Sequence, residues 1–354
     1  MTYLKNTWYV AAWDDEVPPG LILARTYLDE PVILFRDSQG RPQAIGDRCP
    51  HRFAPLSKGC VKGDAVQCVY HGLKFDGSGK CTHNPHGNGN IPSQAKVRAY
   101  PMIERHSILW IWMGDPDKAD GDLIPDYSQS LSPEKRFVGK DYLHARANYQ
   151  LETDNIMDLS HIEFLHPGSL GSEAVSRAKT EVKQVGNTVY SNRLTRDERL
   201  HESLEERYNV TAGEQVDRWL DVRWDPPANM ELWVGIAPTG ADDPRKVGKR
   251  IPFNHFFTPE TEKTAHYWFS TSYPRRMGEE GERRAREDVK YLRGPFESED
   301  LPMLEAQQKA MGDAEFWSLK PILLPGDAAA VRARRVMDAL IKEEQQAISQ
   351  APSA

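Results

Sequence analysis

The chain has 354 residues, a formal net charge of −7 at pH 7 and a pI near 5.9, values that argue against a nucleic-acid-binding protein. Its length predicts about two domains. No apolar run approaches the roughly 18 residues that span a membrane, and the N-terminus lacks the charged and apolar regions of a signal peptide. We therefore expect a soluble cytoplasmic protein, in which no disulfide between Cys60 and Cys81 is needed.

Residues 1–125 have β character. The run at 31–36 predicts a strand, and 43–45 resumes the sheet after a turn. Residues 115–122 are polar and rich in Asp, which is typical of a connection between structured segments. They are the predicted linker, and they divide the chain into an N-terminal domain of residues 1–125 and a C-terminal domain of residues 126–354.

The most informative motif of the N-terminal domain is a Cys-x-His pair followed, after sixteen residues, by a Cys-x-x-His pair: Cys49, His51, Cys68 and His71. A Rieske [2Fe–2S] cluster needs this set, because one iron is held by two cysteines and the other by two histidines. The alternative is a Cys2His2 zinc site, in which two cysteines and two histidines are each grouped together. Because each pair here is mixed, the pattern favours the cluster and a role in single-electron transfer.

The C-terminal domain mixes helices with strands. A helix is predicted over 151–164, ended near Pro167, and a longer one over 283–311, interrupted at Gly294-Pro295. A last helix is predicted over 328–346. Strands are predicted at 188–194, 230–237 and 266–271.

A second metal motif lies in the first of these helices, where His161 and His166 are five residues apart. Two histidines and one later carboxylate form the facial triad of non-haem Fe(II) oxygenases, which leaves coordination positions open for O2 and substrate. The best candidate for the carboxylate is Asp300, and Glu299 and Glu305 are its rivals. Alone, two such histidines are more often ordinary helix-end residues, but beside a cluster motif they indicate an electron acceptor.

Asp158 lies three residues before His161, on the same side of the predicted helix. One interpretation is a surface carboxylate. The favoured one is a hydrogen-bond acceptor for His161, which fixes the tautomer of that ligand and raises its basicity.

These motifs resemble the oxygenase component of the Rieske non-haem iron oxygenases over nearly the whole chain. Further strings are similar to the group that contains dicamba monooxygenase, vanillate O-demethylase and toluenesulfonate methyl-monooxygenase. They are residues 8–12, 83–89, 110–116, 154–159 and 258–261.

The resemblance implies an α+β protein, with an N-terminal all-β Rieske domain and a C-terminal helix-grip domain built on an antiparallel sheet. It implies a [2Fe–2S] cluster, a mononuclear Fe(II), a head-to-tail homotrimer and a ferredoxin and/or reductase that delivers electrons from NAD(P)H. The activity that it implies is the O2-dependent O-demethylation of a substituted aromatic compound. Aryl-methyl hydroxylation and N-dealkylation are alternatives, and a Rieske electron carrier is the rival from another class.

The resemblance also implies residue roles. Asp158, grouped with Asn155 as catalytic, matches a carboxylate that links a cluster histidine, here His71, to an iron histidine of the neighbouring subunit. His255 matches a substrate-contacting histidine, although a solvent-facing strand histidine is the alternative. Leu232 stands where a polar substrate contact is found in dicamba monooxygenase, which argues against the same substrate. Cys81, His83 and His86 are interpreted as part of a loop over the cluster and not as a zinc site.

Overall fold

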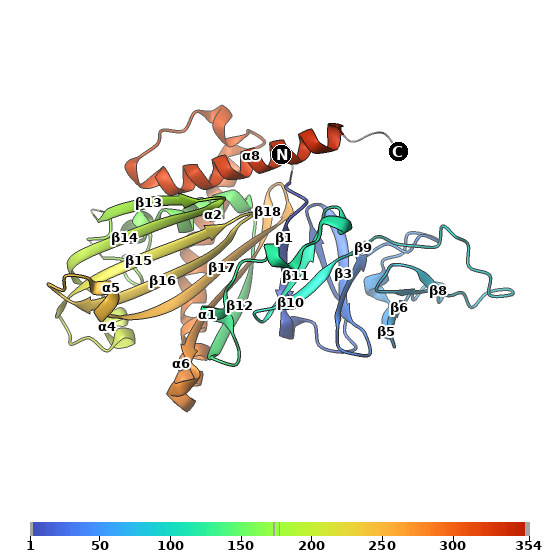
Figure 1. Ribbon diagram of the computed structural model, residues 1–354, viewed down its shortest axis with the longest axis horizontal. Coiled ribbons are helices and arrows are strands. Elements are labelled where there is room, and N and C mark those ends of the chain that lie inside the picture. The colour runs from blue at the N-terminus through green and yellow to red at the C-terminus, as the bar shows by residue number, and fades with distance from the viewer. Residues whose placement is uncertain (1–2, 173, 177, 351–354) are drawn as a thin grey trace. The chain divides into compact units, whose positions relative to one another are not determined.

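The computed structural model describes residues 3–172, 174–176 and 178–350. It contains two compact units (Figure 1). The N-terminal unit comprises residues 5–125 together with 258–262, and the C-terminal unit comprises most of the remaining chain. Among the described residues, no helix has the length and apolar character that a membrane crossing requires.

The N-terminal unit is built from three antiparallel sheets. The first contains β1 (Trp8–Trp13), β11 (Ile108–Trp112) and β10 (Met102–Arg105). The second contains β2 (Leu23–Tyr27), β3 (Glu30–Arg36), β4 (Pro42–Gly46) and β9 (Ala99–Tyr100). The third contains β5 (Cys60–Lys62), β6 (Ala65–Gln67), β7 (Lys74–Asp76) and β8 (Cys81–His83). The strands predicted at 31–36 and 43–45 are β3 and β4.

The predicted linker at 115–122 is a folded part of this unit. It forms two 3-10 turns, η3 (Pro116–Lys118) and η4 (Gly121–Leu123), whose first backbone amides are capped by the carboxylates of Asp115 and Asp120. The indole Nε1 of Trp8 donates to the carbonyl of Asp120 at 2.7 Å. Asp at an N-cap satisfies amides that the turn leaves unpaired, and this explains why an Asp-rich run is ordered here.

The C-terminal unit has one sheet of seven strands in the order β12-β18-β17-β16-β15-β14-β13 (Figure 1). Its strands are β12 (Arg136–Ala145), β13 (Lys179–Val185), β14 (Thr188–Arg199), β15 (Gln215–Asp225), β16 (Asn229–Pro238), β17 (Lys249–Thr261) and β18 (Thr264–Pro274). The register is antiparallel from β13 through β17 and between β12 and β18. The three predicted strands correspond to β14, β16 and β18.

Helices pack against this sheet. The α-helices of the unit are α1 (Ser128–Leu131), α2 (Tyr149–Met157), α3 (Ile162–Leu165), α4 (Glu202–Tyr208), α5 (Pro244–Val247), α6 (Gly278–Pro295), α7 (Leu301–Met311) and α8 (Ala328–Gln350). Helix α6 packs on β12 and β18, where a Cβ on Gly139 would lie 1.9 Å from the Ala285 carbonyl oxygen, so only glycine permits this approach. Helix α8 packs on α2, and buried Arg334 pairs with Asp154 at 2.6 Å.

Two predicted helices differ from the observed ones at functionally important points. The helix expected over 151–164 is interrupted at Asp158, which ends α2 and begins the 3-10 turn η5 (Leu159–His161) by accepting from the Ser160 amide. Asp favours such a cap over a helix interior. The helix expected over 283–311 starts at Gly278 and, after Pro295, continues through a π-helical turn, η7 (Phe296–Asp300). Such turns are frequent at functional sites.

Candidate functional site

Two loops of the N-terminal unit present the Cys-His pairs in the same backbone geometry. The amide of Cys49 donates to the Ala54 carbonyl, and the Phe53 amide returns to the Cys49 carbonyl, both at 2.9 Å. The second loop repeats this pattern. The Cys68 amide donates to the Leu73 carbonyl, and the Gly72 amide donates to the Cys68 carbonyl. Phe53 and Gly72 occupy equivalent positions with φ of 58° and 73°. Each loop therefore folds over its own cysteine and carries its histidine at the tip.

The four side chains of these loops fit the donor set of a Rieske cluster. Cys49 and Cys68 are buried, at 2% and 1% exposure, whereas His51 is exposed and His71 is half-buried. The rings of His51 and His71 lie 4.4 Å apart between centroids. Burial raises the pKa of the Cys49 thiol to about 11, so a thiolate at this depth requires a metal beside it. Two buried thiols and two more exposed imidazoles fit the mixed ligand set that such a cluster needs.

The loop that follows β8 lies beside the cluster position. His86 Nε2 lies 2.9 Å from the carbonyl oxygen of His71, and a Cβ on Gly72 would meet the Pro85 ring at 3.1 Å. A cavity of about 420 Å³ is lined by this loop and by His51 and His71. His86 therefore contacts the backbone of a cluster motif, in agreement with a covering loop.

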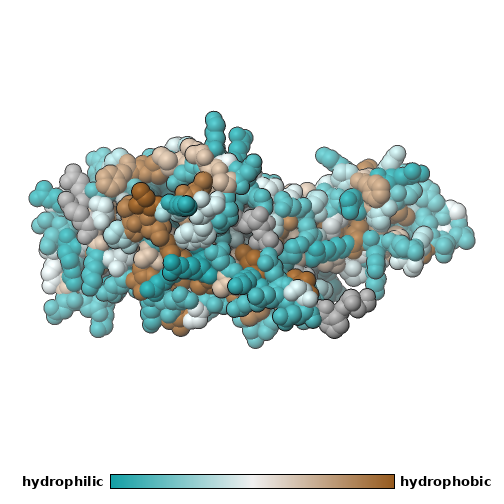
Figure 2. Space-filling view, turned by 90° about the horizontal axis from the view of Figure 1, so that it is seen from above, coloured by the Kyte–Doolittle hydropathy of each residue, from teal (hydrophilic) through white to brown (hydrophobic). Residues whose placement is uncertain are grey.

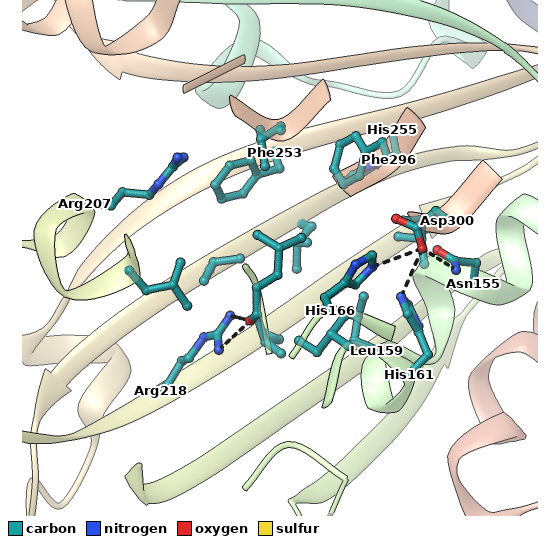
Figure 3. A pocket seen from close by; sticks show the side chains of 18 of the residues that line it. Asn155, Leu159, His161, His166, Arg207, Arg218, Phe253, His255, Phe296 and Asp300 are labelled. Carbon is teal, nitrogen blue, oxygen red and sulfur yellow. Dashed lines mark hydrogen bonds and ion pairs between the residues drawn. The ribbon is translucent and has the colours of Figure 1, made fainter. Parts of the chain in front are cut away.

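In the C-terminal unit, the structure brings His161, His166 and Asp300 together (Figure 3). The Asp300 Oδ1 lies 3.1 Å from His166 Nε2 and 3.5 Å from His161 Nε2. Three donor atoms within 4.8 Å of one another fit a common ion, since such ligands lie about 2.0–2.2 Å from a transition metal. The π-helical turn η7 supplies Asp300, and the segment from η5 to the end of α3 supplies the histidines.

The outer ring nitrogens of both histidines are held by other groups. His161 Nδ1 lies 2.8 Å from the backbone carbonyl of Asp158, and His166 Nδ1 hydrogen-bonds the Glu299 carboxylate. Each contact leaves Nε2 free for a metal, which is the usual arrangement of metal-ligating histidines. Asn155 Nδ2 donates to Asp300 Oδ1 at 3.0 Å. Glu299, a rival for the third ligand position, thus lies behind His166.

The electrostatics of the triad also fit a divalent metal. Burial lowers the pKa of His161 and keeps its imidazole neutral. Burial opposes a charge on His166, but hydrogen bonds to Asp300 and Glu299 outweigh it and raise its pKa. A metal ion at Nε2 takes the place of that proton. The other rival, Glu305, accepts from the Arg146 amide at 3.3 Å and lies outside this group.

The contacts of Asp158 differ from those expected. Its backbone carbonyl, and not its carboxylate, accepts from His161. The carboxylate instead binds Arg193 Nη2 at 2.8 Å and the Ser160 hydroxyl at 2.8 Å. The break in the helix at Asp158 turns the carbonyl toward His161 and leaves the side chain free for Arg193. Arg193 gave no signal in the sequence, because its role depends on strand β14 meeting the C-terminal end of α2.

An apolar cavity of about 70 Å³ opens beside the triad (Figure 3). Leu232 and His255 both line it, so these two expected substrate contacts lie with the metal triad. His255 is 2% exposed, which contradicts the alternative of a solvent-facing histidine. Its Nδ1 lies 2.8 Å from the Tyr267 hydroxyl, and its Nε2 is buried without a partner among the described residues. Burial lowers the pKa of His255 to about 4, so the ring is neutral at physiological pH.

Two arginines at the end of the cavity opposite the triad were not anticipated from the sequence (Figure 3). Arg218 is 3% exposed and pairs with Glu198 at 3.0 Å, and Arg207 pairs with Asp288 at 3.2 Å. Arg218 lies in β15 and Arg207 in α4. Neither residue belongs to a sequence motif that would indicate a binding site. Only the folded sheet places them beside the same cavity as His255.

The two donor sets and the apolar cavity define an oxidoreductase with two separate iron sites. A model of the Rieske [2Fe-2S] domain matches residues 7–101, and a model of the vanillate O-demethylase oxygenase C-terminal domain matches residues 145–343. The chain therefore belongs to the Rieske non-haem iron monooxygenases, as an oxygenase component of the vanillate O-demethylase type. Its cofactors are a [2Fe–2S] cluster and a mononuclear iron.

Individual relatives can be aligned with nearly the whole of this chain. The toluene-4-sulfonate monooxygenase system iron-sulfur subunit TsaM1 of Comamonas testosteroni is 38% identical, over 97% of this chain and 98% of the relative. The oxygenase component of chloroacetanilide N-alkylformylase from Rhizorhabdus wittichii is 38% identical, over 97% of each chain. The crystal structure of dicamba monooxygenase bound to 3,6-dichlorosalicylic acid matches with a TM-score of 0.87 and 35% identity, over 98% of this chain and 99% of that chain.

Proposed function

We propose that this oxygenase removes a methyl group from the oxygen of a substituted aromatic compound. Aryl methyl ether, O2, two electrons and two protons would give a phenol, formaldehyde and water. The observation that carries the proposal is the triad of His161, His166 and Asp300 at one end of an apolar cavity, in a chain whose family model is named for an O-demethylase.

In this proposal Cys49, His51, Cys68 and His71 hold the cluster. His161, His166 and Asp300 hold the mononuclear iron. When bound, the cluster supplies single electrons and the iron supplies the position at which O2 is reduced.

The surrounding residues fix the three iron ligands. Glu299 and the carbonyl of Asp158 hold the outer nitrogens of the two histidines, and Asn155 donates to Asp300. These contacts select the Nε2 lone pairs and limit rotation of the ligands. Asn155 and Asp158 thereby serve as positioning residues for the iron ligands.

The cavity orients the substrate and keeps water out. Leu232 and its apolar neighbours contact the ring, and the free Nε2 of neutral His255 binds a polar substituent. A cavity of about 70 Å³ is smaller than the ~150 Å³ that accommodates benzene, so lining side chains move outward when an aromatic substrate enters.

Two alternative reactions begin with oxidation of the same kind of C–H bond. The name of one relative indicates monooxygenation of toluene-4-sulfonate, and that of another indicates loss of an N-alkyl group from a chloroacetanilide. The triad accommodates aryl-methyl hydroxylation or N-dealkylation equally well. A Rieske electron carrier, the rival class, would not require a mononuclear iron site such as this triad.

We also propose assembly into a head-to-tail homotrimer, in which Asp158 faces His71 of a neighbouring subunit. A second cavity, of about 340 Å³, is lined by Asp158 and His161 and by the segment before α8. Figure 2 shows apolar side chains gathered on the face that carries α8. Exposed apolar residues in this region are Met303, Leu319, Ile322, Leu323 and Leu324. An apolar surface of this kind favours contact with another protein.

The electron donor is proposed to be a ferredoxin and/or a reductase that draws on NAD(P)H. Around the cluster histidines, Phe53, Val69 and Tyr70 are 71%, 67% and 63% exposed. These apolar side chains offer a docking surface next to the group that receives the electrons.

The function is tested by supplying the iron-loaded protein with a surrogate ferredoxin and reductase, NADH and a panel of aryl methyl ethers, N-alkyl anilides and aryl-methyl acids. Formaldehyde released in step with phenol supports O-demethylation. Retained carbon, as a benzylic alcohol, identifies methyl hydroxylation, and an aniline product identifies N-dealkylation. Electron transfer without any oxidised product would favour the carrier.

The assembly is tested with mixed trimers of His71→Ala and His161→Ala chains. Transfer between subunits predicts partial recovery of activity, because some interfaces join an intact cluster to an intact iron site. If verified mixed trimers recover nothing, the path between subunits is wrong.

A further inference from the structure

The cavity beside the triad carries two polar groups whose bonding capacity is unused. His255 Nε2 and Arg218 Nε are both buried and have no hydrogen-bond partner within the described chain. Buried donors of this kind are normally satisfied, so an unpaired pair lining one cavity points to a ligand. The remaining lining is largely apolar, from Leu220, Val234 and Phe253 among others.

Arg218 is held in place with one side of its guanidinium occupied. Nη1 donates to Glu198 at 3.0 Å, and Nη1 and Nη2 contact the Leu170 carbonyl at 3.3 and 3.2 Å. Glu198 is itself fixed by the hydroxyls of Ser172 and Thr195. The guanidinium therefore has a defined orientation, with Nε–H still available.

The charges around the cavity are already balanced. Arg218 pairs with Glu198, and Arg207 pairs with Asp288. His255 is neutral because burial lowers its pKa to about 4, and burial raises the pKa of Tyr208 to about 12, which keeps its phenol protonated. An anionic substituent at this end would bring a buried charge without an unpaired cation to meet it, which is unfavourable.

We propose that the substrate is an uncharged aromatic compound whose neutral oxygen acceptor, such as an amide carbonyl, binds Arg218 Nε at the end of the cavity opposite the triad. Figure 3 places Arg218 and Arg207 at that end, with the triad at the other. A substrate bound in this way directs its opposite end, which carries the alkyl group, toward His161 and Asp300. The inference rests on the proposed function, because it names the substrate class of the same site.

The test compares 4-methoxybenzamide with 4-methoxybenzoate, which have the same ring and ether and differ in charge. Calorimetric binding to the iron-loaded wild-type protein is measured beside formaldehyde release. We expect the amide to bind at least roughly tenfold more tightly than the acid, because the benzoate would bury a charge with no unpaired cation to meet it. Tighter binding of the benzoate would overturn the inference.

Arg218→Lys tests the residue. It keeps a cation beside Glu198, which protects the fold, but removes the Nε–H donor. We expect amide affinity to fall about 10- to 100-fold while benzoate affinity changes little. The matched control is Arg196→Lys, because Arg196 also pairs with a buried carboxylate, Asp217, but does not line the cavity. Equal losses for both variants and both ligands would remove Arg218 from substrate recognition.

The two proposals fail differently. Amide binding that depends on Arg218, without formaldehyde release, would leave the substrate class intact and reject O-demethylation. Formaldehyde release that is faster from the acid, and insensitive to Arg218→Lys, would support O-demethylation and reject the substrate class.

Discussion

Arg193 Nη2 lies 2.8 Å from Oδ1 of Asp158, and this pair connects the iron site to the surface of the C-terminal unit. Arg193 is 4% exposed and also donates to the Val175 carbonyl at 2.7 Å. The carboxylate of Asp158 accepts a hydrogen bond from Arg193, and its backbone carbonyl accepts one from His161 Nδ1. Asp158 thus contacts an iron-site histidine through its backbone carbonyl and is among the residues that line the second cavity, of about 340 Å³.

Asp158→Asn tests the role of that carboxylate. The amide keeps the shape but removes the charge that faces Arg193 and that would face His71 of a neighbouring subunit. We expect both metal sites to stay loaded and cluster reduction to stay fast, while product formation falls by orders of magnitude. Stopped-flow reduction and product assays separate the two steps. Full product formation would show that the carboxylate is dispensable.

Gly326→Ala disturbs the same carboxylate without changing its chemistry. A Cβ on Gly326 would lie 2.6 Å from Asp158 Oδ2, so the side chain must move away. We expect lower product formation with both metals retained, together with a stability loss of about 1–3 kcal/mol from the weakened contact with Arg193. The control is Gly294→Ala in α6, where a Cβ meets nothing within 4 Å. That change should leave activity intact and add up to ~1 kcal/mol of stability.

Glu299→Gln and Asp300→Asn separate the metal ligand from its supporting partner. Asp300 is the proposed ligand, so Asp300→Asn should remove the mononuclear iron. Glu299 lies behind His166, so Glu299→Gln should weaken iron binding roughly 10- to 100-fold without abolishing it. Chelator competition, followed by metal analysis, measures both affinities. The reverse order of effects would make Glu299 the ligand.

The metal-binding motifs and part of the fold were predictable from local sequence. Cys49, His51, Cys68 and His71 have a spacing specific enough to identify the cluster type, and the predicted strands match β3, β4, β14, β16 and β18. The interruption at Asp158 and the π-helical turn at Phe296–Asp300 were not, because each depends on capping or proline effects within a longer helical pattern.

The surroundings of the site depended on tertiary structure. Arg193, Arg218 and Gly326 contribute through contacts with residues more than 30 positions away or beside a cavity that exists only in the folded sheet. Periodicity in the sequence identifies which face of a helix or strand is buried. It does not identify which polar side chains form hydrogen bonds with one another in the folded protein. His255 was placed in the site only through a resemblance, and its unpaired Nε2 required the structure.

The burial of Glu152 leads us to expect that the stability of the folded protein depends on pH. Burial raises its pKa to about 8, against 4.5 for the free group, and its Oε1 has no partner among the described residues. Between about pH 5 and 8 the unfolded chain ionises this carboxyl while the folded chain keeps it protonated, so stability falls as the pH rises. Glu152→Gln should reduce this slope and be more stable than wild type at pH 8. Denaturant unfolding of the iron-loaded proteins at pH 5 and 8 measures it, and identical slopes would contradict the prediction.

The most direct test of the two-site account is the ratio of iron to acid-labile sulfide in three purified proteins. Wild type should hold about three irons and two sulfides per chain, His161→Ala about two irons with an unchanged cluster spectrum, and Cys68→Ser at most about one iron with no Rieske signal. Cys60→Ser, at an exposed cysteine, should match wild type. Two irons per chain in an active wild-type enzyme, or an intact Rieske spectrum in Cys68→Ser, would contradict the account.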